Sequence, residues 1–180
     1  MVLFDATTLL VLIAPQAAVP SDSAGKTIEY PKEGVDGLLE VLKKRNEKII
    51  IPTPALSEVF VRTDLQTSVQ HLERMKKSRY LRIEPFCERA AIEVAQMTRK
   101  AIGNGDKRSG RDSETWAKIK YDRQIVAIAA VHRAATIYSD DKKLTAFAKD
   151  RGFNVVGLGS LPIPDNKAQR DFFKDGQADA

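Results

Sequence analysis

Short apolar runs alternate with longer amphipathic segments along most of the chain. Each run is rich in Val, Ile, Leu or Phe and is bounded by polar, Gly or Pro residues, as buried strands are. The strands predicted from these runs are 2–4, 49–51, 80–83, 136–139 and 153–156. Between the runs, apolar residues recur at helical spacing, so helices are predicted to connect the strands.

Two of the predicted helices begin at capping residues. Thr7 or Thr8 can cap a helix over 9–13, because threonine accepts hydrogen bonds from free N–H groups. Thr53-Pro54 starts another, since proline suits the first helical position. The remaining helices are predicted around Leu38 to Leu42 and over 69–77, 90–102, 114–135 and 144–151.

Strands that alternate with helices predict an α/β fold, with a mostly parallel central sheet between two layers of helices. The pattern extends over 1–158, which we interpret as one domain with polar loops at 15–34 and 103–113. Residues 159–180, rich in Pro, Gly and charge, are predicted to be a partly ordered tail. Binding sites in such folds gather at the carboxyl ends of the strands.

Acidic residues follow two of the predicted strands. Asp5 ends the first, and Asp140 and Asp141 end the fourth. Each of them has an ordinary structural explanation, because an Asp between a strand and a helix can cap that helix. The carboxyl ends of parallel strands share one edge of a sheet, however, so the fold can bring these carboxylates together.

Two further acids lie on predicted helices. Asp122 shares a helical stripe with Ile119 and Ile125, which should face the core. A buried carboxylate is costly unless it pairs with Arg or Lys, takes up a proton or binds a metal. Glu58 has Arg62 one turn away as a simpler partner. Taken together, acids at two strand ends and on two helix faces predict a site for a hard cation.

Composition adds a class of partner and excludes several kinds of site. The formal charge of +5 over 180 residues suits the phosphates of a nucleic acid, although mild basicity alone is weak evidence. The single cysteine, Cys87, rules out an internal disulfide and a Cys-rich zinc site. No apolar run reaches the roughly 20 residues of a membrane span, and no basic segment precedes the first one. We therefore expect a soluble, cytoplasmic protein without membrane contact.

Histidines and basic residues are the remaining side chains considered for a functional site. His71 and His132 have no acid–base partner nearby in the sequence, so both are predicted to be surface residues. Charge runs are usually solvated faces, but some can contact substrate phosphates. The candidates for such contacts are Lys76, Lys77, Arg79, Arg108 and Arg111.

Four segments, in this order, carry a family resemblance: 2–7 (VLFDAT), 51–59 (IPTPALSEV), 121–129 (YDRQIVAIA) and 137–144 (IYSDDKKL). With them, the chain resembles the PIN-domain nucleases, which include the VapC-type toxin ribonucleases of bacterial toxin–antitoxin pairs. Each segment is short and common, so the specificity of the resemblance lies in finding all four between Val2 and about Leu158.

The resemblance implies a PIN-like three-layer α/β/α fold and a metal-dependent endoribonuclease that hydrolyses RNA phosphodiesters. It implies Mg²⁺ or Mn²⁺ as the cofactor, a homodimer and, for a toxin, a protein antitoxin as partner. The ligands that it implies are Asp5, Glu58, Asp122, Asp140 and Asp141. Among these, Asp141 matches the fourth catalytic acid of the family more closely than Asp140 does.

The chain also departs from the family pattern. Thr7 stands where the family often has Asn or Ser, and it is predicted, with Ser139, to donate hydrogen bonds to a carboxylate or to water. One alternative is a PIN-like module that binds RNA or protein without cutting. Another is a phosphohydrolase with Asp5 as nucleophile, which is disfavoured because Thr7 replaces the second Asp that such enzymes use.

Overall fold

Five parallel strands form the central sheet, in the order β3-β2-β1-β4-β5. The computed structural model describes residues 1–14, 21 and 25–163. The strands are β1 (Val2–Phe4), β2 (Ile49–Pro52), β3 (Leu81–Glu84), β4 (Thr136–Tyr138) and β5 (Asn154–Val156). β1 is central, with Leu3 in register with Ile50 on one side and with Ile137 on the other. The predicted α/β class with a parallel sheet is confirmed.

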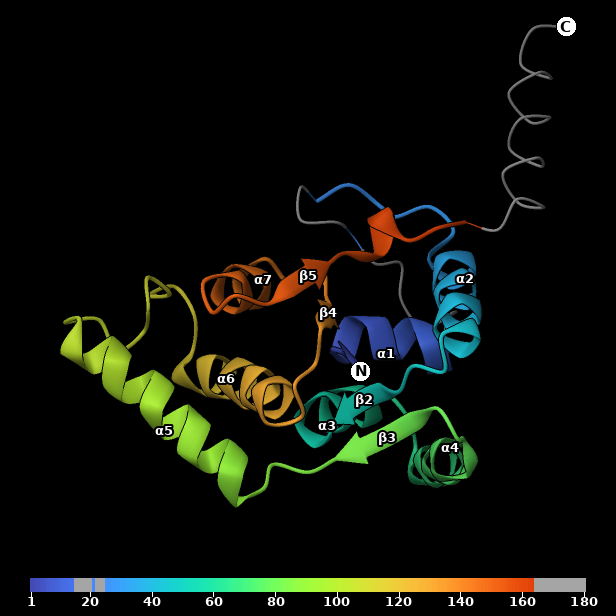
Figure 1. The fold of residues 1–180 in the computed structure, drawn as a ribbon, viewed down its shortest axis with the longest axis horizontal. Helices are drawn as coiled ribbons and strands as arrows, with labels where there is room; N and C mark the ends of the chain where they lie inside the picture. Colours follow the sequence, from blue (N-terminus) through green and yellow to red (C-terminus); the bar gives the residue numbers. More distant parts are fainter. Residues whose placement is uncertain (15–20, 22–24, 164–180) are drawn as a thin grey trace, which may run out of the picture.

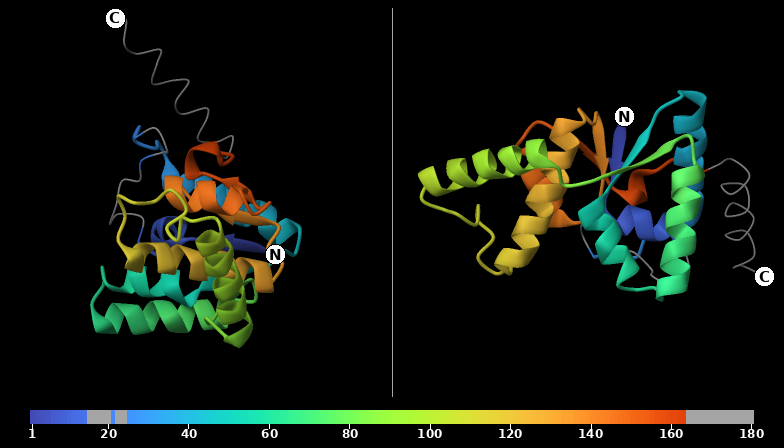
Figure 2. Two further views of the ribbon diagram at one scale, coloured as in Figure 1. Left: turned by 90° about the vertical axis from the view of Figure 1, so that its left-hand side faces the viewer. Right: turned by 90° about the horizontal axis from the view of Figure 1, so that it is seen from below.

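Helices cover both faces of this sheet (Figures 1 and 2). They are α1 (Ala6–Ile13), α2 (Pro31–Lys44), α3 (Thr53–Phe60), α4 (Leu65–Lys77), α5 (Glu88–Gly103), α6 (Trp116–Val131), α7 (Lys142–Lys149) and the short 3₁₀ helix η1 (Leu158–Ser160). In Figure 1, α5, α6 and α7 lie to the left of the strands and α2 and α4 to the right. The arrangement is therefore three layers.

The pleat of the strands divides the apolar residues between two cores. Val2 and Phe4 of β1 pack with α1 and α2, whereas Leu3 packs with α6 and α7 on the opposite face. Successive strand residues point to opposite faces, and a parallel sheet covered on both sides buries them all. Continuous apolar strands are thus what this architecture requires.

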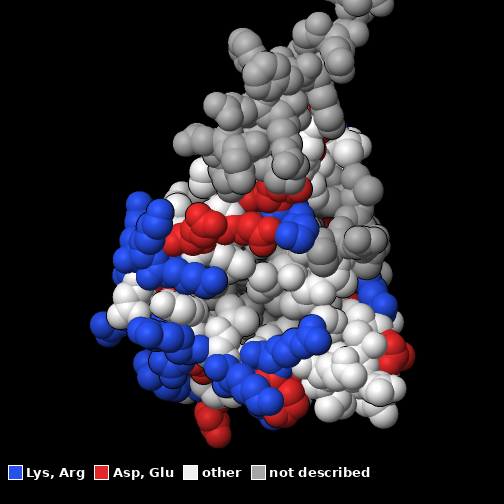
Figure 3. Space-filling model, turned by 90° about the vertical axis from the view of Figure 1, so that its right-hand side faces the viewer, with Lys and Arg blue, Asp and Glu red and all other residues white. Residues whose placement is uncertain are grey.

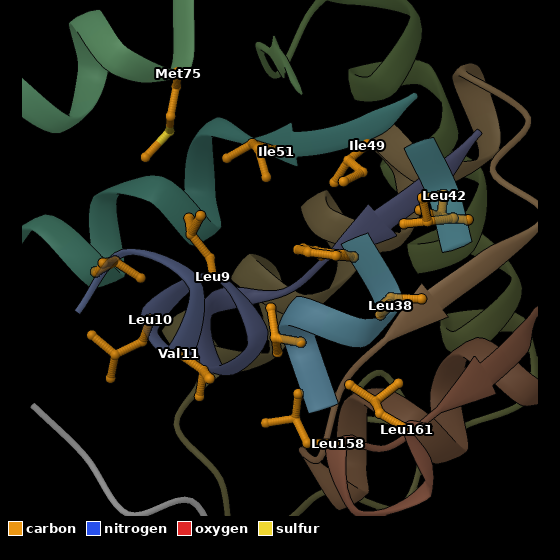
Figure 4. Packing of buried hydrophobic residues seen from close by; sticks show 14 of the residues in the cluster. Leu9, Leu10, Val11, Leu38, Leu42, Ile49, Ile51, Met75, Leu158 and Leu161 are labelled. Atoms are coloured by element: carbon orange, nitrogen blue, oxygen red, sulfur yellow. The ribbon is translucent and has the colours of Figure 1, made fainter. Parts of the chain in front are cut away.

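The first core is closed by the end of the described chain (Figure 4). Leu158 and Leu161 are buried against α2, and a Cβ built on Gly34 would lie 3.2 Å from the Leu161 Cβ. Leu161 falls within the predicted tail 159–180 and yet belongs to the core. The part of that tail from 164 onward lies outside the described residues.

Several helix boundaries differ from those predicted. The cap of α1 is Asp5, whose carboxylate accepts the Thr8 N–H, so the prediction of a threonine cap is wrong. α2 begins at Pro31, inside the stretch predicted as a loop. α6 ends at Val131, before the predicted 135, because Arg133 adopts a left-handed conformation with φ of 52° that a helix cannot continue through.

Candidate metal centre

Asp5 lies at the point of the sheet where the strand order reverses. From β1 the chain builds outward through β2 and β3 and then returns to β4 on the other side of β1, so the carboxyl ends of β1 and β4 are neighbours. Such a reversal is where open α/β sheets bind ligands. Asp5 is 3% exposed, and its two carboxylate oxygens accept hydrogen bonds from the Thr8 N–H at 2.9 Å and the Ser139 hydroxyl at 2.5 Å.

The surroundings of Asp5 disfavour its charge. Desolvation by burial raises the pKa of Asp5 from 3.8 to about 6, although the hydrogen bonds from Ser139 and Thr8 oppose the shift. The charge of Asp140 adds to the increase. A carboxylate in this position gains when a cation is placed beside it, because an opposite charge favours the ionised form.

Asp122 is buried in α6, as its place on the apolar stripe predicts. It is 2% exposed, and one of its oxygens accepts a hydrogen bond from the Arg111 guanidinium. The other oxygen lies 3.6 Å from the Lys118 Nζ. Burial raises the pKa of Asp122, and the two cations only partly offset this increase. Of the possible partners for a buried carboxylate, the structure shows Arg and Lys.

Asp141 is the cap of α7 and is tied to α6. Its Oδ1 accepts the N–H groups of Lys143 and Leu144 at 2.8 and 2.9 Å, and its Oδ2 accepts from the Lys118 Nζ at 2.7 Å. Burial raises the pKa of Asp141, but Lys118 and the backbone donors outweigh it, so the pKa lies below its ordinary value. Asp141 is therefore a charged anchor for Lys118.

The Asp140 carboxylate makes its contacts near β5 and η1. It accepts the Leu158 N–H at 3.1 Å. Gly157 is needed for this contact, because a Cβ at that position would lie only 2.6 Å from the Asp140 Oδ1. The contacts of Asp140 thus lead toward β5 and η1, whereas those of Asp141 lead toward α6.

Glu58 stands at the exposed rim of the cluster. It lies on α3, which packs against α6, and lines a cleft of about 240 Å³ with Thr7 and Arg62. Partial desolvation raises the pKa of Glu58; Lys118 lowers it, and the charges of Asp122 and Asp141 raise it. Although Glu58 is exposed, it therefore shares the electrostatic field of Asp122 and Asp141.

Two protein cations lie among these acids. Arg111 is 4% exposed and its guanidinium contacts both Glu114 and Asp122, while Lys118 contacts Asp122 and Asp141. Within the described residues, no three Asp, Glu, His or Cys side chains are spaced to hold a metal ion as they stand. Asp122 and Asp141 are joined by Lys118, and Arg111 and Lys118 offset only part of the negative charge of the acids.

The donor set nevertheless suits a hard divalent cation. It consists of carboxylate oxygens, which Mg²⁺ and Mn²⁺ prefer, and it lacks the thiolates and imidazoles that softer metals select. The buried Asp5 and Asp122 both have raised pKa values, so each would gain from added positive charge. The donor atoms are thus of the kind that Mg²⁺ and Mn²⁺ prefer, although Arg111 and Lys118 contact the Asp122 and Asp141 oxygens in the structure.

Three of the basic residues predicted to contact substrate lie away from the acids. Lys76, Lys77 and Arg79 precede β3, at the amino edge of the sheet, where Lys48 donates a hydrogen bond to the Arg79 carbonyl. Figure 3 shows Lys and Arg gathered along one margin of the face that carries α2 and α4. The structure does not bring these residues together with the acids, because parallel strands separate the two edges.

The two candidates for substrate contacts in the 103–113 loop form their contacts inside the protein. Arg108 donates to the backbone carbonyl of Glu114, and Arg111 is buried on Asp122. The group of α1 that holds Asp5 is the Thr8 backbone N–H, while the Thr8 hydroxyl donates to the Tyr138 carbonyl at 3.0 Å. Thr7 lines the cleft beside Glu58 instead. Ser139, by contrast, donates to Asp5 and accepts the Asp141 N–H at 3.1 Å, as a residue that positions both acids would.

Sequence reasoning missed two basic residues of α6, Lys118 beside the acids and Arg123 beneath the neighbouring loop. Lys118 lies four residues before Asp122, and this spacing alone could have indicated the ion pair. Arg123 is 1% exposed and sits under the 103–113 loop, where it donates to the Lys107 carbonyl at 2.7 Å. Its signal was weaker, because an Arg in the polar first half of α6, next to exposed Lys120 and Tyr121, is expected to face solvent.

Comparison with known proteins agrees with the fold. No protein-family model and no curated protein matches the chain. Its fold is similar to that of a chain in the crystal structure of VapBC2 from Rickettsia felis bound to a DNA fragment from their promoter. The TM-score is 0.57 over 87% of this chain and 98% of that chain, with 14% identity. The fold is PIN-like, as predicted.

None of the helices in the described part of the chain is long and apolar enough to span a bilayer. The histidines lie apart from the acids in their contacts: His132 approaches Glu84 at the end of β3, with 3.4 Å between Nε2 and Oε2. His71 lies on α4, which packs against β3. Within the described residues, neither histidine forms an ion pair with Asp5, Asp122 or Asp141.

Proposed function

We propose that the protein is a Mg²⁺- or Mn²⁺-dependent endoribonuclease. The observation that carries the proposal is the pair of buried carboxylates, Asp5 and Asp122, with raised pKa values at the carboxyl edge of a PIN-like sheet. Asp141 and Glu58 share the electrostatic field of Asp122, and Ser139 contacts both Asp141 and Asp5. Burying acids at the edge of the sheet where open α/β folds bind ligands costs stability, and a functional site is a reason for this cost.

In this proposal, Asp5 and Asp122 hold the cation, and Glu58 and Asp141 complete the set. When bound, the metal would lower the pKa of a water molecule and neutralise charge on the phosphodiester. Ser139 orients Asp5 through its hydroxyl and Asp141 through the backbone N–H. The Thr8 N–H holds the second oxygen of Asp5, so the carboxylate is positioned before any ligand arrives.

The similarity to a VapBC2 chain supports a place in a toxin–antitoxin pair, with a protein antitoxin as partner. A homodimer and a cytoplasmic location belong to the same proposal. The net charge of +5 suits RNA as substrate, with contacts to its phosphates that weaken as salt is raised.

The decisive experiment compares the wild type with Asp122→Asn in a Mn²⁺-dependent RNA cleavage assay. The substitution keeps the size of the side chain and removes the charge, so we expect cleavage to fall by about a hundredfold or more. Asp36→Asn, an exposed acid on α2 that pairs with Lys32, is the matched control and should cut like the wild type. Undiminished cutting by Asp122→Asn would contradict the assignment.

A second candidate is a PIN-like module that binds RNA or protein without cutting. The pairing of Arg111 and Lys118 with Asp122 and Asp141 favours it, because both cations occupy oxygens that a metal would need. The two functions separate in one measurement: a wild type that retains RNA in a gel-shift assay but cleaves none, with Mg²⁺ or Mn²⁺ present, would be the binding module.

A further inference from the structure

A polar cleft lies beside the carboxylate cluster, at the carboxyl ends of β4 and β5. Its volume is about 420 Å³, and it is bounded by these two strands, by α7 and by η1. The polar side chains that line it are those of Ser139, Asp140, Thr145, Lys149 and Ser160. Ligands of open α/β folds bind at this end of the strands, so the cleft is well placed for one.

Ser139 joins this cleft to the acids. It lines the cleft, and its hydroxyl donates to the Asp5 Oδ2 at 2.5 Å. Its backbone N–H donates to the Val156 carbonyl of β5 at 3.0 Å, which holds the wall of the cleft against the end of β4. A polymer held at the acids therefore has this cleft as an adjoining place for its next unit.

Asp140 is the acid of this cleft, and its contacts alone do not call for a charge. Its carboxylate accepts the Leu158 N–H, and the lack of a side chain at Gly157 leaves room for it. An asparagine oxygen would accept the same N–H. The charge of Asp140 instead raises the pKa of Asp5, because the two carboxylates repel each other. A carboxylate kept at this cost indicates a role that needs an ionised acceptor.

The lining of the cleft suits a sugar and a phosphate better than a base. Single-stranded bases are usually bound by stacking on aromatic rings, and the lining residues in the described part of the chain include none. Lys149 can meet a phosphate, while Thr145 and Ser160 supply hydroxyls. An ionised Asp140 only accepts hydrogen bonds, so its partner in a ligand must be a donor. A ribose hydroxyl is such a donor, and acids bind it in dinucleotide-binding α/β folds.

We infer that this cleft binds a ribonucleotide of the substrate strand, with Asp140 accepting a hydrogen bond from the ribose 2′-hydroxyl and Lys149 contacting a phosphate. The inference rests on the proposed function, from which it takes RNA as the ligand, and it adds how RNA is distinguished from DNA. Deoxyribose would bring a methylene group to the carboxylate, which would lose water without gaining a partner. The cleft therefore selects ribose.

The test compares three oligonucleotides of equal length and base: oligo(U), oligo(dU), which lacks the 2′-hydroxyl, and 2′-fluoro oligo(U). Fluorescence anisotropy in EDTA measures their dissociation constants, so no metal ion takes part. The fluorine keeps the sugar pucker of RNA but cannot donate a hydrogen bond. We therefore expect the wild type to bind oligo(U) about tenfold more tightly than either of the others.

Two variants separate the sugar contact from the phosphate contact. Asp140→Ala should remove the preference: its affinity for oligo(U) falls to that for oligo(dU), while its affinity for oligo(dU) does not fall. Lys149→Met should weaken binding of all three by a similar factor and lower the salt dependence by about one released counterion. Asp36→Ala and Lys100→Met, at exposed positions of α2 and α5, are the matched controls and should bind like the wild type.

The inference is overturned if the wild type binds oligo(U) and its 2′-fluoro form equally, or binds neither. It is also overturned if Asp140→Ala loses affinity for oligo(U) and oligo(dU) alike, as a merely structural role would require. A wild type that still cuts RNA with Mn²⁺ would then remain the proposed nuclease.

The opposite result is distinguishable. The expected preference without any cleavage would leave the ribose site standing and refute the nuclease. If Asp140→Ala fails to fold in a circular-dichroism melt, the wild type alone still decides, because the 2′-fluoro probe removes the same hydrogen bond from the side of the ligand.

Discussion

Two aspartates that follow neighbouring strands have opposite electrostatic surroundings. Asp5 receives its hydrogen bonds from neutral donors, and burial raises its pKa to about 6. Asp141 receives a charged donor, Lys118, and its pKa lies below the ordinary value although burial opposes this. Titratable groups whose surroundings separate their pKa values are typical of sites that divide acid and base roles. Near neutral pH, Asp141 is the fixed charge and Asp5 the adjustable one.

The raised pKa of Asp5 predicts how stability depends on pH without metal. Between the unfolded value of 3.8 and the folded value of about 6, the native state binds the extra proton, so stability falls as pH rises through this window. Above it the charged form costs about 3 kcal/mol. Asp5→Asn removes this cost. The variant should exceed the wild type in stability by about 2–3 kcal/mol near pH 8.

Urea denaturation with EDTA, from about pH 4 to about pH 8, measures this difference. It should shrink toward zero at the acid end, where Asp5 is protonated in both states. Asn can still accept the Thr8 N–H, so the cap is kept in the comparison. A stability difference that does not vary with pH would show that Asp5 is not desolvated as described.

At the scale of elements, the connection between α5 and α6 is held by a buried arginine. The Arg123 guanidinium donates to the Thr98 hydroxyl on α5 at 2.9 Å and to the Lys107 carbonyl at 2.7 Å, and its plane lies over the Trp116 ring at 5.3 Å. The same connection carries Arg111 to Asp122. The loop is therefore attached at two points, one structural and one inside the carboxylate cluster.

We predict that Arg123→Lys loosens this connection. Lysine lacks the fork that reaches Thr98 and Lys107 together, so about 2 kcal/mol of stability should be lost. Amide hydrogen exchange over 104–115 should become faster while exchange in the strands changes little. Arg99→Lys, an exposed arginine on α5, is the control and should leave both quantities unchanged. Unaltered exchange in the loop would mean that Arg123 does not hold it.

At the scale of the whole molecule, the last described residues complete the first core. Leu161 packs on α2 beside Gly34 (Figure 4 shows Leu161 next to Leu158). The segment of β5 and η1 thus packs on α2, although more than a hundred positions separate this segment from α2 in the sequence. The stability of the domain depends on residues beyond its last strand.

Gly34→Val tests this closure. Its side chain would meet Leu161 and the Leu158 carbonyl within van der Waals distance, so we expect a loss of about 1–3 kcal/mol from overpacking. Gly103→Val is the matched control, since that glycine is also helical and a Cβ there has no neighbour within 4 Å. Thermal melts of both variants provide the comparison. Equal melting temperatures would argue against a tight contact between Gly34 and Leu161.

The sequence predicts the fold well because the relevant signals are periodic. The continuous apolar runs of β1 and β2 and the helical stripe that contains Asp122 follow from burial, and the structure shows both. The partners of the acids carry no periodic signal. Arg111 reaches Asp122 only through the path of a loop, and Lys76 lies far from the acids only because of where α4 ends. Pairing of charges needs three-dimensional information that hydrophobic spacing does not contain.

Asp5 and Asp141 each cap a helix as well as belonging to the carboxylate cluster. Alanine at either position would therefore confound loss of activity with loss of a cap, which by itself costs about 1 kcal/mol. Asparagine separates the two effects, since it caps nearly as well and carries no charge. We therefore expect Asp5→Asn and Asp141→Asn to be the better inactive variants for co-purification with a partner or with uncut substrate. For the same reason, an evolutionary change of Asp5 or Asp141 to Asn can abolish catalysis and leave a folded protein that still binds.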